Sequence, residues 1–147
     1  MTKDISGFGV AVTIIASGTF PIGFTVTQFA DDSDPLDFAA VNIADKAMGL
    51  NGDMITWAKA QPLPMTLNVI AGSTDDISLN ILAQANRVGQ GKTSAFDLIT
   101  ATVVYPDGTV KVLTGGRMTD APFGSSIASA GRLKSKTYNF WFANVIG

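Results

Sequence analysis

The chain has 147 residues, of which 46% are hydrophobic and only 15% are charged, and its formal net charge is −2. This length is enough for one domain with a buried core, and the charge excludes a strongly basic surface built to hold nucleic acid. Cysteine and histidine are both absent, which excludes disulfides, thiolate metal sites, thiol nucleophiles and the commonest general base.

The N-terminal part of the chain predicts two strands and a long connection. Residues 9–15 are rich in β-branched side chains and residues 24–29 alternate, so both segments favour strands that pair as a hairpin. Residues 31–61 show no clear period. A connection of this length is unusual inside a compact domain, and its many apolar residues argue against a disordered linker. We therefore expect a long loop that packs against another surface.

A third strand and a helix are predicted next. Residues 65–70 alternate cleanly between two faces. Ser73 then has the properties of a helix N-cap, and the two aspartates that follow at 75 and 76 favour the positive end of a helix dipole. Apolar residues continue at helical spacing, and Gly89 is the predicted end of the helix.

The C-terminal part predicts three more strands. Residues 106–108, Pro-Asp-Gly, are a strong turn signal between strands at 98–105 and 109–113. A loop of small residues occupies 115–131, and an aromatic-rich strand follows at 136–145. The chain is therefore predicted to be mainly β, with about six strands and one helix.

Motifs that carry chemistry are weak. Residues 89–93 resemble the end of a phosphate-binding loop, but Asn86 replaces the required glycine and the predicted helix comes before the motif instead of after it. Four aspartates between 31 and 37 lack the central glycine and terminal glutamate of a calcium loop, so they fit a solvated turn better. Alternating aromatic residues at 138–142 are more typical of a core than of a sugar platform. We therefore predict no enzyme and no catalytic, cofactor-binding or metal-binding residue.

Two segments carry a resemblance to a known family. Residues 51–87 provide a loop, a strand and a helix, and residues 103–145 provide a turn-linked strand pair, a loop and a closing aromatic strand. In sequence and order these segments resemble the tail tube proteins of contractile-tailed, myovirus-type bacteriophages. The resemblance implies a β-sandwich or partial barrel with one flanking helix and a long inserted loop, in one tail-tube-like domain that spans residues 1–147.

The resemblance also implies a function. In that family six subunits form a ring, and rings stack into a tube through which double-stranded DNA passes during genome ejection without specific binding. The chain would then be a structural virion protein of the tail, made in the host cytoplasm, with no cofactor and no membrane insertion of its own. Its implied partners are further copies of itself, the tail sheath protein, the baseplate and the tail terminator.

Three alternatives stay open, and one of them is a small hydrolase built on a pair of aspartates. The inner tube of a contractile bacteriocin or of a type VI-like injection system shares the implied fold. A small carbohydrate-binding β-sandwich is the alternative from another class, and it would use Trp57, Tyr138 and Trp141 as its aromatic platform.

Two sets of residues are candidates for roles in a tube. The family's corresponding loop reaches a neighbouring subunit, so residues 31–61 are the expected inter-subunit arm. Its candidate interface residues are Phe38, Met48, Leu50, Met54 and Trp57. A channel that conducts DNA needs a wall without fixed cations, because each contact with a phosphate adds affinity and drag. The candidates for this wall are Thr25, Thr27, Thr66 and Asn68, with Thr100 and Thr102 on similar polar strand faces. The alternative is that these faces simply meet solvent outside.

Overall fold

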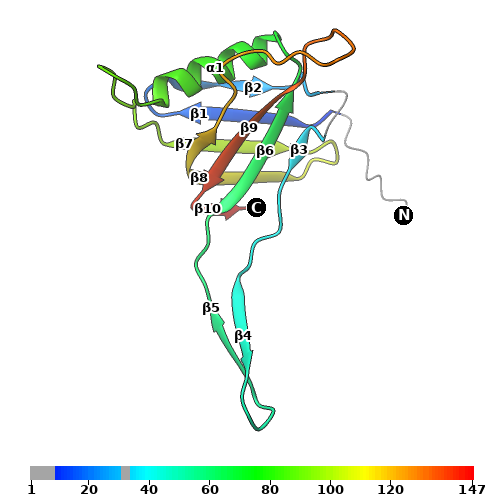
Figure 1. Cartoon of the computed structure of the whole chain (residues 1–147), viewed down its shortest axis with the longest axis vertical. Helices are drawn as coiled ribbons and strands as arrows, with labels where there is room; N and C mark the ends of the chain where they lie inside the picture. Colours follow the sequence, from blue (N-terminus) through cyan, green and yellow to red (C-terminus); the bar gives the residue numbers. More distant parts are fainter. Residues whose placement is uncertain (1–8, 31–33) are drawn as a thin grey trace.

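The computed structural model describes residues 9–30 and 34–147. Part of the predicted acidic turn, at positions 31 and 32, therefore lies outside the described residues. The described chain forms two β-sheets packed face to face, a helix at one end of this sandwich, and a two-stranded ribbon that projects from the other end (Figure 1). The prediction of a mainly β fold with one flanking helix is confirmed.

The first sheet holds five antiparallel strands. In spatial order they are β2 (Phe20–Val26), β1 (Ala11–Ala16), β7 (Ile99–Val104), the first half of β8 (Val110–Asp120) and β10 (Asn144–Ile146). The predicted hairpin of β1 and β2 is confirmed, although β2 begins four residues earlier than expected, at Phe20. Pro21 is tolerated there because β2 is an edge strand, where a missing N–H donor leaves no central ladder bond unmade.

The second sheet crosses the first. Its strands are β3 (Leu36–Asp37), β6 (Leu63–Val69), β9 (Lys136–Phe142) and the second half of β8, again all antiparallel. The predicted strand at 136–145 was therefore wrong in one respect, because it divides at Ala143. Its first part, β9, pairs in the second sheet, and its last part, β10, pairs with β8 in the first sheet.

The strand β8 joins the two sheets through a bend at two glycines. Gly115 has a φ of +68°, which side chains other than glycine rarely adopt. A Cβ atom on Gly116 would lie 2.2 Å from the ring of Phe142, so only glycine leaves room for that core side chain. The prediction that a loop begins at residue 115 is wrong, since these glycines mark a bend inside a strand of 11 residues.

The core lies between the inner faces of the two sheets. Phe140 and Phe142 stack there with ring centroids 6.2 Å apart, and Tyr138 is fully buried beside them. The prediction that the C-terminal aromatic residues are core is confirmed for these three. The other large side chains that are almost completely buried are Val12, Ile14, Val26, Met65, Leu67, Leu79, Leu82, Ile99 and Leu113.

The helix α1 (Thr74–Asn86) covers one open end of the sandwich and places Leu79 and Leu82 in the core. Its predicted N-cap is confirmed, because the Ser73 hydroxyl accepts a hydrogen bond from the Asp76 backbone N–H. The predicted end at Gly89 is wrong by three residues. The helix ends at Asn86, whose side chain donates to the Leu82 carbonyl and to Asp97. No helix in the described part of the chain is long and apolar enough to cross a membrane.

The projecting ribbon corrects the prediction of a long irregular loop. Within that segment β4 (Ala44–Met48) pairs with β5 (Met54–Ala58) in a regular antiparallel hairpin, which extends away from the sandwich (Figure 1). The strands were missed because a half-buried strand is recognised by apolar residues on alternate positions. In this ribbon apolar residues stand on both faces, so the alternation is absent.

Candidate functional site

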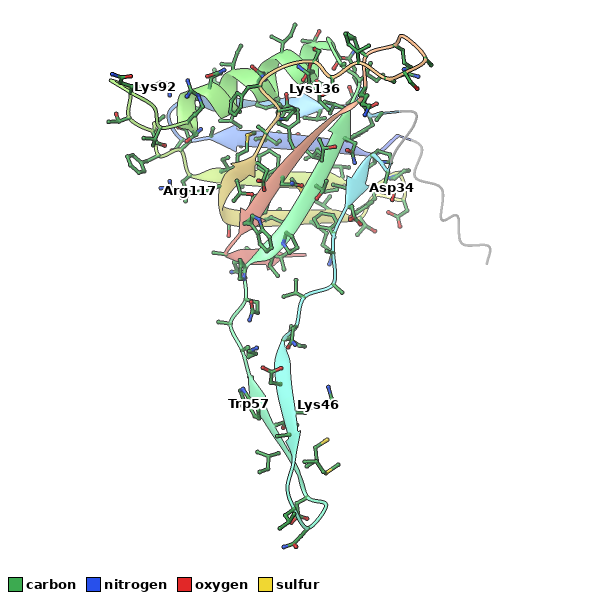
Figure 2. The ribbon with its side chains drawn as sticks, viewed as in Figure 1. Asp34, Lys46, Trp57, Lys92, Arg117 and Lys136 are labelled. Atoms are coloured by element: carbon green, nitrogen blue, oxygen red, sulfur yellow. The ribbon has the colours of Figure 1, made fainter. Side chains whose placement is uncertain are left out.

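The arm, defined here as residues 38–61 and containing β4 and β5, exposes apolar side chains on both of its faces. Directly opposed residues of an antiparallel pair share a face, so Met48 and Met54 lie on one face and Ile55 and Trp57 on the other. These four side chains are 48–68% exposed, and Leu50 at the tip is completely exposed. Figure 2 shows the side chains of the arm, including the labelled Trp57, standing clear of the sandwich.

The arm receives little support from its own contacts. A two-stranded ribbon without a packed face is marginally stable in water. The ion pair between Lys59 Nζ and Asp45 Oδ2, at 2.5 Å, joins the two strands, but both side chains are about one-third exposed, and such surface pairs contribute about 0–1 kcal/mol. Contiguous exposed apolar surface usually marks a binding site. The arm therefore has the properties of a segment that is covered by another protein surface on each face.

The structure separates the predicted interface residues into two places. Met48, Leu50, Met54 and Trp57 lie on the ribbon or its tip, whereas Phe38 lies at the root of the arm beside the sandwich. Two further residues belong with the ribbon group and were missed among the candidates. They are Ile43, which is 73% exposed, and Ile55. Pairing the two strands around the Gly49 to Gly52 turn would have revealed both of them.

A groove lies at the root of the arm, where the inner faces of the two sheets separate. Its volume is about 290 Å³, and its lining is mostly apolar, with side chains from the arm root, β6, β8 and β10. Lys111 is the cation of this groove, and its ammonium donates to the carbonyl oxygen of Gly147. Lys111 lies opposite Val103 in the register, so it is on the core side of β8 and not on the outer face of the sheet.

The outer face of the first sheet carries no charge on any of its described strand residues. Thr13 lies opposite Thr25 on one side and Thr102 on the other, and the hydroxyls of Thr13 and Thr25 are 3.2 Å apart. Thr100 shares this face because it lies opposite Ile15. The remaining outward positions of β1, β7, β8 and β10 are Ala11, Val104, Val110, Val112, Thr114, Asn144 and Ile146.

The outer face of the second sheet is different, because it is polar and charged. It carries Asp37, Arg117 and Asp120 among threonine, asparagine and tryptophan side chains. Two predicted wall residues belong to it. Thr66 donates to the Asn139 side-chain oxygen at 2.9 Å, and Asn68 is only 9% exposed.

The four predicted wall residues therefore do not share one surface. Thr25 lies on the uncharged face, Thr66 and Asn68 lie on β6 of the second sheet, and Thr27 follows the end of β2. The Thr27 backbone N–H donates to the Asp75 carboxylate at 2.8 Å. Thr13 was missed, although it alternates with the buried residues of β1 in the way that an outward position should.

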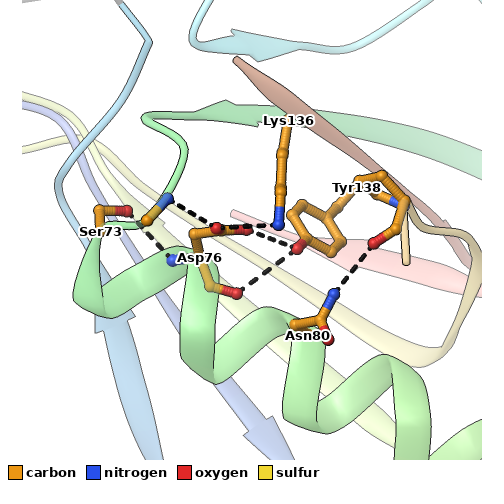
Figure 3. A network of polar contacts seen from close by, with 7 residues as sticks. Ser73, Asp76, Asn80, Lys136 and Tyr138 are labelled. Atoms are coloured by element: carbon orange, nitrogen blue, oxygen red, sulfur yellow. Dashed lines mark hydrogen bonds and ion pairs between the residues drawn. The ribbon is translucent and has the colours of Figure 1, made fainter. Parts of the chain in front are cut away.

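Buried carboxylates attach the helix to the sheets. Asp76 Oδ1 accepts a hydrogen bond from the Tyr138 hydroxyl at 2.7 Å, and Asp76 Oδ2 accepts one from the Gly72 N–H at 2.9 Å (Figure 3). Lys136 Nζ forms an ion pair with the same Oδ2 at 3.2 Å. Burial, together with the hydrogen bond to Asp76, raises the pKa of Tyr138 well above its usual range. The phenol therefore stays protonated and donates to the carboxylate. This cluster fixes α1 against β9.

Asp97 attaches the turn between β1 and β2 to the end of α1. Its carboxylate accepts from the backbone N–H groups of Gly18 at 2.7 Å and Thr19 at 3.1 Å, from the Thr19 hydroxyl and from the Asn86 amide. Burial acts to raise the pKa of Asp97, but the hydrogen bonds from Thr19, Asn86 and Gly18 outweigh it and lower the pKa. All these contacts are structural. In the residues that the structure describes, no group of three or more potential ligands is placed to hold a metal ion.

The amino-acid sequence of the chain matches a known protein family. Residues 3–146 match the family model described as tail fiber protein gp32. The chain belongs to the tail fiber protein gp32 family. A search of curated proteins found no match.

Solved structures show the same fold for this gp32-family chain. The sheath/tube terminator of an extracellular contractile injection system, PVC, in the extended state, is 14% identical, with a TM-score of 0.59 over 99% of this chain and 97% of that chain. The tube terminating cap of the anti-feeding prophage is 13% identical, with a TM-score of 0.56 over 99% and 91%. A chain of the anti-feeding prophage baseplate, 6-fold symmetrised, is 10% identical, with a TM-score of 0.60 over 100% and 98%.

The family match confirms the prediction of a phage-tail-type protein, and the similar structures, which come from contractile injection systems, show the same fold. The family match also confirms the coarser functional part of the prediction, a structural component of a tail. The aromatic platform of the carbohydrate-binding alternative is not formed, because Tyr138 is fully buried between the sheets.

Proposed function

We propose that this gp32-family chain is a self-assembling subunit of a tail tube, in which rings of copies stack around a channel that conducts double-stranded DNA. The observation that carries the proposal is the arm, whose apolar side chains are exposed on both faces. A ribbon of this kind needs a protein surface on each side. Neighbouring copies of the same chain supply such surfaces at every position of a symmetric assembly.

The similar structures support a place in such an assembly. They are a sheath/tube terminator, a tube terminating cap and a baseplate with 6-fold symmetry. A ring of six copies is therefore the proposed unit. The sheath, the baseplate and the terminator are the proposed neighbours of the tube.

The proposed wall of the channel is the uncharged outer face of the first sheet. Fixed cations on a channel wall would bind DNA phosphates and slow its passage. None of the described strand residues on this face is a lysine or arginine, and Lys111 of β8 lies on the core side of its strand. The outer face of the second sheet carries Arg117 and is the less suitable wall.

Assembly is tested on purified protein by electron microscopy and sedimentation velocity over a wide concentration range. We expect rings or stacked rings for the unaltered chain and loss of both in the Trp57→Ala variant. Trp141→Ala is the matched control, since Trp141 is also partly exposed but lies on the second sheet. A chain that stays monomeric throughout, or a Trp57→Ala variant that assembles normally, would contradict the proposal.

The channel wall is tested by placing lysines on each sheet. Thr25→Lys with Thr102→Lys should leave tubes intact and reduce genome delivery, whereas Thr66→Lys, on the second sheet, should leave delivery unchanged. The reverse result would assign the wall to the second sheet, as the sequence-based choice of Thr66 and Asn68 implies. Equal delivery by all variants would mean that neither face lines the channel.

A second candidate function is a terminator that ends the tube. Two of the similar structures are described as a tube terminator and a terminating cap, and this observation favours it. A terminator would form single rings that do not stack on one another. Side views of the particles in the electron microscope distinguish single rings from tubes.

A further inference from the structure

We propose that the tip of one arm docks in the groove at the root of the arm of a second copy. The inference rests on the proposed function, because it specifies one contact by which copies assemble. The arm tip is the turn between β4 and β5, with Met48, Leu50, Asp53 and Met54. The groove is the apolar hollow of about 290 Å³ at the arm root.

The chemistry of the groove matches the tip. Phe38, Leu63, Leu113 and Val145 supply apolar walls from four different segments of the chain. An apolar cavity of about 150 Å³ holds a benzene ring, so a groove of about 290 Å³ has room for about two apolar side chains. Leu50 and one of the two methionines at the tip have that size and are exposed. Methionine adapts its shape to irregular apolar surfaces.

The charges also match. Lys111 lines the groove, and its ammonium contacts a carbonyl oxygen of Gly147. Asp53 is exposed at the tip, three positions after Leu50. A carboxylate that arrives with Leu50 would therefore meet a cation beside the apolar walls, and such complementary charges fix the orientation and register of a contact.

The tip cannot reach the groove of its own chain in the extended arm. The groove lies at the root of the arm, whereas the turn between β4 and β5 lies at the far end of the ribbon (Figure 1). About a dozen extended residues between Phe38 and Leu50 span about 40 Å at about 3.3 Å each. Each copy therefore offers one tip and one groove at separate places. A head-to-tail contact between them repeats from copy to copy, and it closes into a ring or continues as a stack according to the rotation between copies.

The absence of cysteine from the chain makes cross-linking a clean test. Two single variants, Leu50→Cys at the tip and Ala39→Cys at the groove, are purified separately, mixed under assembling conditions and oxidised. We expect a covalent dimer that contains one chain of each variant, identified by mass spectrometry. The control replaces Ala39→Cys with Ile22→Cys, which is 94% exposed on β2 at the far edge of the first sheet. That mixture should give only background dimer.

Charge reversal provides a second and independent measurement. Asp53→Lys and Lys111→Asp should each raise the concentration needed for assembly about tenfold or more, and the double variant should recover most of that loss. The melting temperature of each variant below the assembly concentration shows whether the sandwich still folds. Failure of the double variant to recover, with folding intact, would count against the pairing of Asp53 with Lys111.

The outcomes separate this inference from the proposed function. If tubes form normally but no disulfide forms between Leu50→Cys of one chain and Ala39→Cys of another, the docking inference is wrong and the proposed function is unaffected. A disulfide within one chain of the Leu50→Cys, Ala39→Cys double variant, in monomeric protein, would show that the arm folds back into its own groove and would also overturn it. If the protein stays monomeric at every concentration, both the proposed function and the docking inference are contradicted.

Discussion

The sandwich and the arm use apolar residues in opposite ways. In the sandwich the inner faces of the strands carry the fully buried apolar side chains, such as Phe140, although the outer face of the first sheet also exposes apolar residues such as Val104 and Ile146. In the arm they occupy both faces and are exposed, as Trp57 and Leu50 are. Burial of apolar area stabilises the sandwich within one chain. The arm contributes nothing comparable in one copy, and under the proposed function its exposed apolar residues are covered by contacts with other copies.

The ion pairs of the two regions also differ in burial: the pair of the sandwich is buried and the pair of the arm is exposed. Lys136 and Asp76 form an ion pair whose side chains are only 11% and 4% exposed, and a tyrosine hydroxyl shares the carboxylate. Lys59 and Asp45 form the corresponding pair of the arm at 35% and 34% exposure. Removing one member of a buried pair leaves a desolvated charge, whereas removing one member of an exposed pair leaves a charge in water.

The largest expected difference in stability is between variants that remove an aromatic side chain from the sandwich or from the arm. Phe140→Ala should lower the free energy of unfolding of the unassembled chain by about 3–5 kcal/mol, because it leaves a cavity in the core. Trp57→Ala should change it by less than about 0.5 kcal/mol, because the side chain is exposed. Denaturant unfolding below the assembly concentration measures both. A large loss of stability in Trp57→Ala would mean that the arm belongs to the core of the single chain.

The next largest difference in the free energy of unfolding is expected between variants that break the ion pair of the sandwich or the ion pair of the arm. Lys136→Met should cost about 3 kcal/mol, since Asp76 would remain buried without its cation. Lys59→Met should cost about 0–1 kcal/mol. The double variant Asp76→Asn with Lys136→Met should be more stable than Lys136→Met alone, because no unpaired charge remains. Equal losses in the Lys136 and Lys59 variants would show that burial does not distinguish the two regions.

A smaller effect depends on pH. The pKa of Asp97 is lowered in the folded chain, so its contribution to stability is present above its unfolded pKa of about 4 and is lost as the pH falls through the folded value. Asp97→Asn should therefore cost about 1–3 kcal/mol at pH 7, and the difference from the unaltered chain should shrink below about pH 4. Urea unfolding at several pH values measures it.

The control for the pH effect lies on the arm. Asp45→Asn should leave the free energy of unfolding within about 0.5 kcal/mol of the unaltered chain at each pH, because it changes an exposed residue. A difference between Asp97→Asn and the unaltered chain that stays constant from pH 7 to strongly acidic solution would contradict the ionised role of Asp97.

The sequence by itself determined the features that depend on neighbours along the chain. Ser73 is the helix cap because its hydroxyl reaches an N–H three residues on. The turn at 106–108 needs a positive φ at position 108, and glycine adopts it there without strain, at +91°. The alternation in β9 marked Phe140 as core. The apolar excess of the 31–61 segment argues against a solvated linker and predicts that it packs against another surface.

Only the tertiary structure decided the features that depend on pairing between distant segments. The uncharged face exists because β1 pairs with β7, nearly ninety positions away, which places Thr13 between Thr25 and Thr102. β8 crosses from one sheet to the other because Gly116 leaves space for the Phe142 ring. The groove combines arm root, β6, β8 and β10. Local patterns specify which way a side chain points relative to its own strand, but the register between strands decides which side chains share a surface.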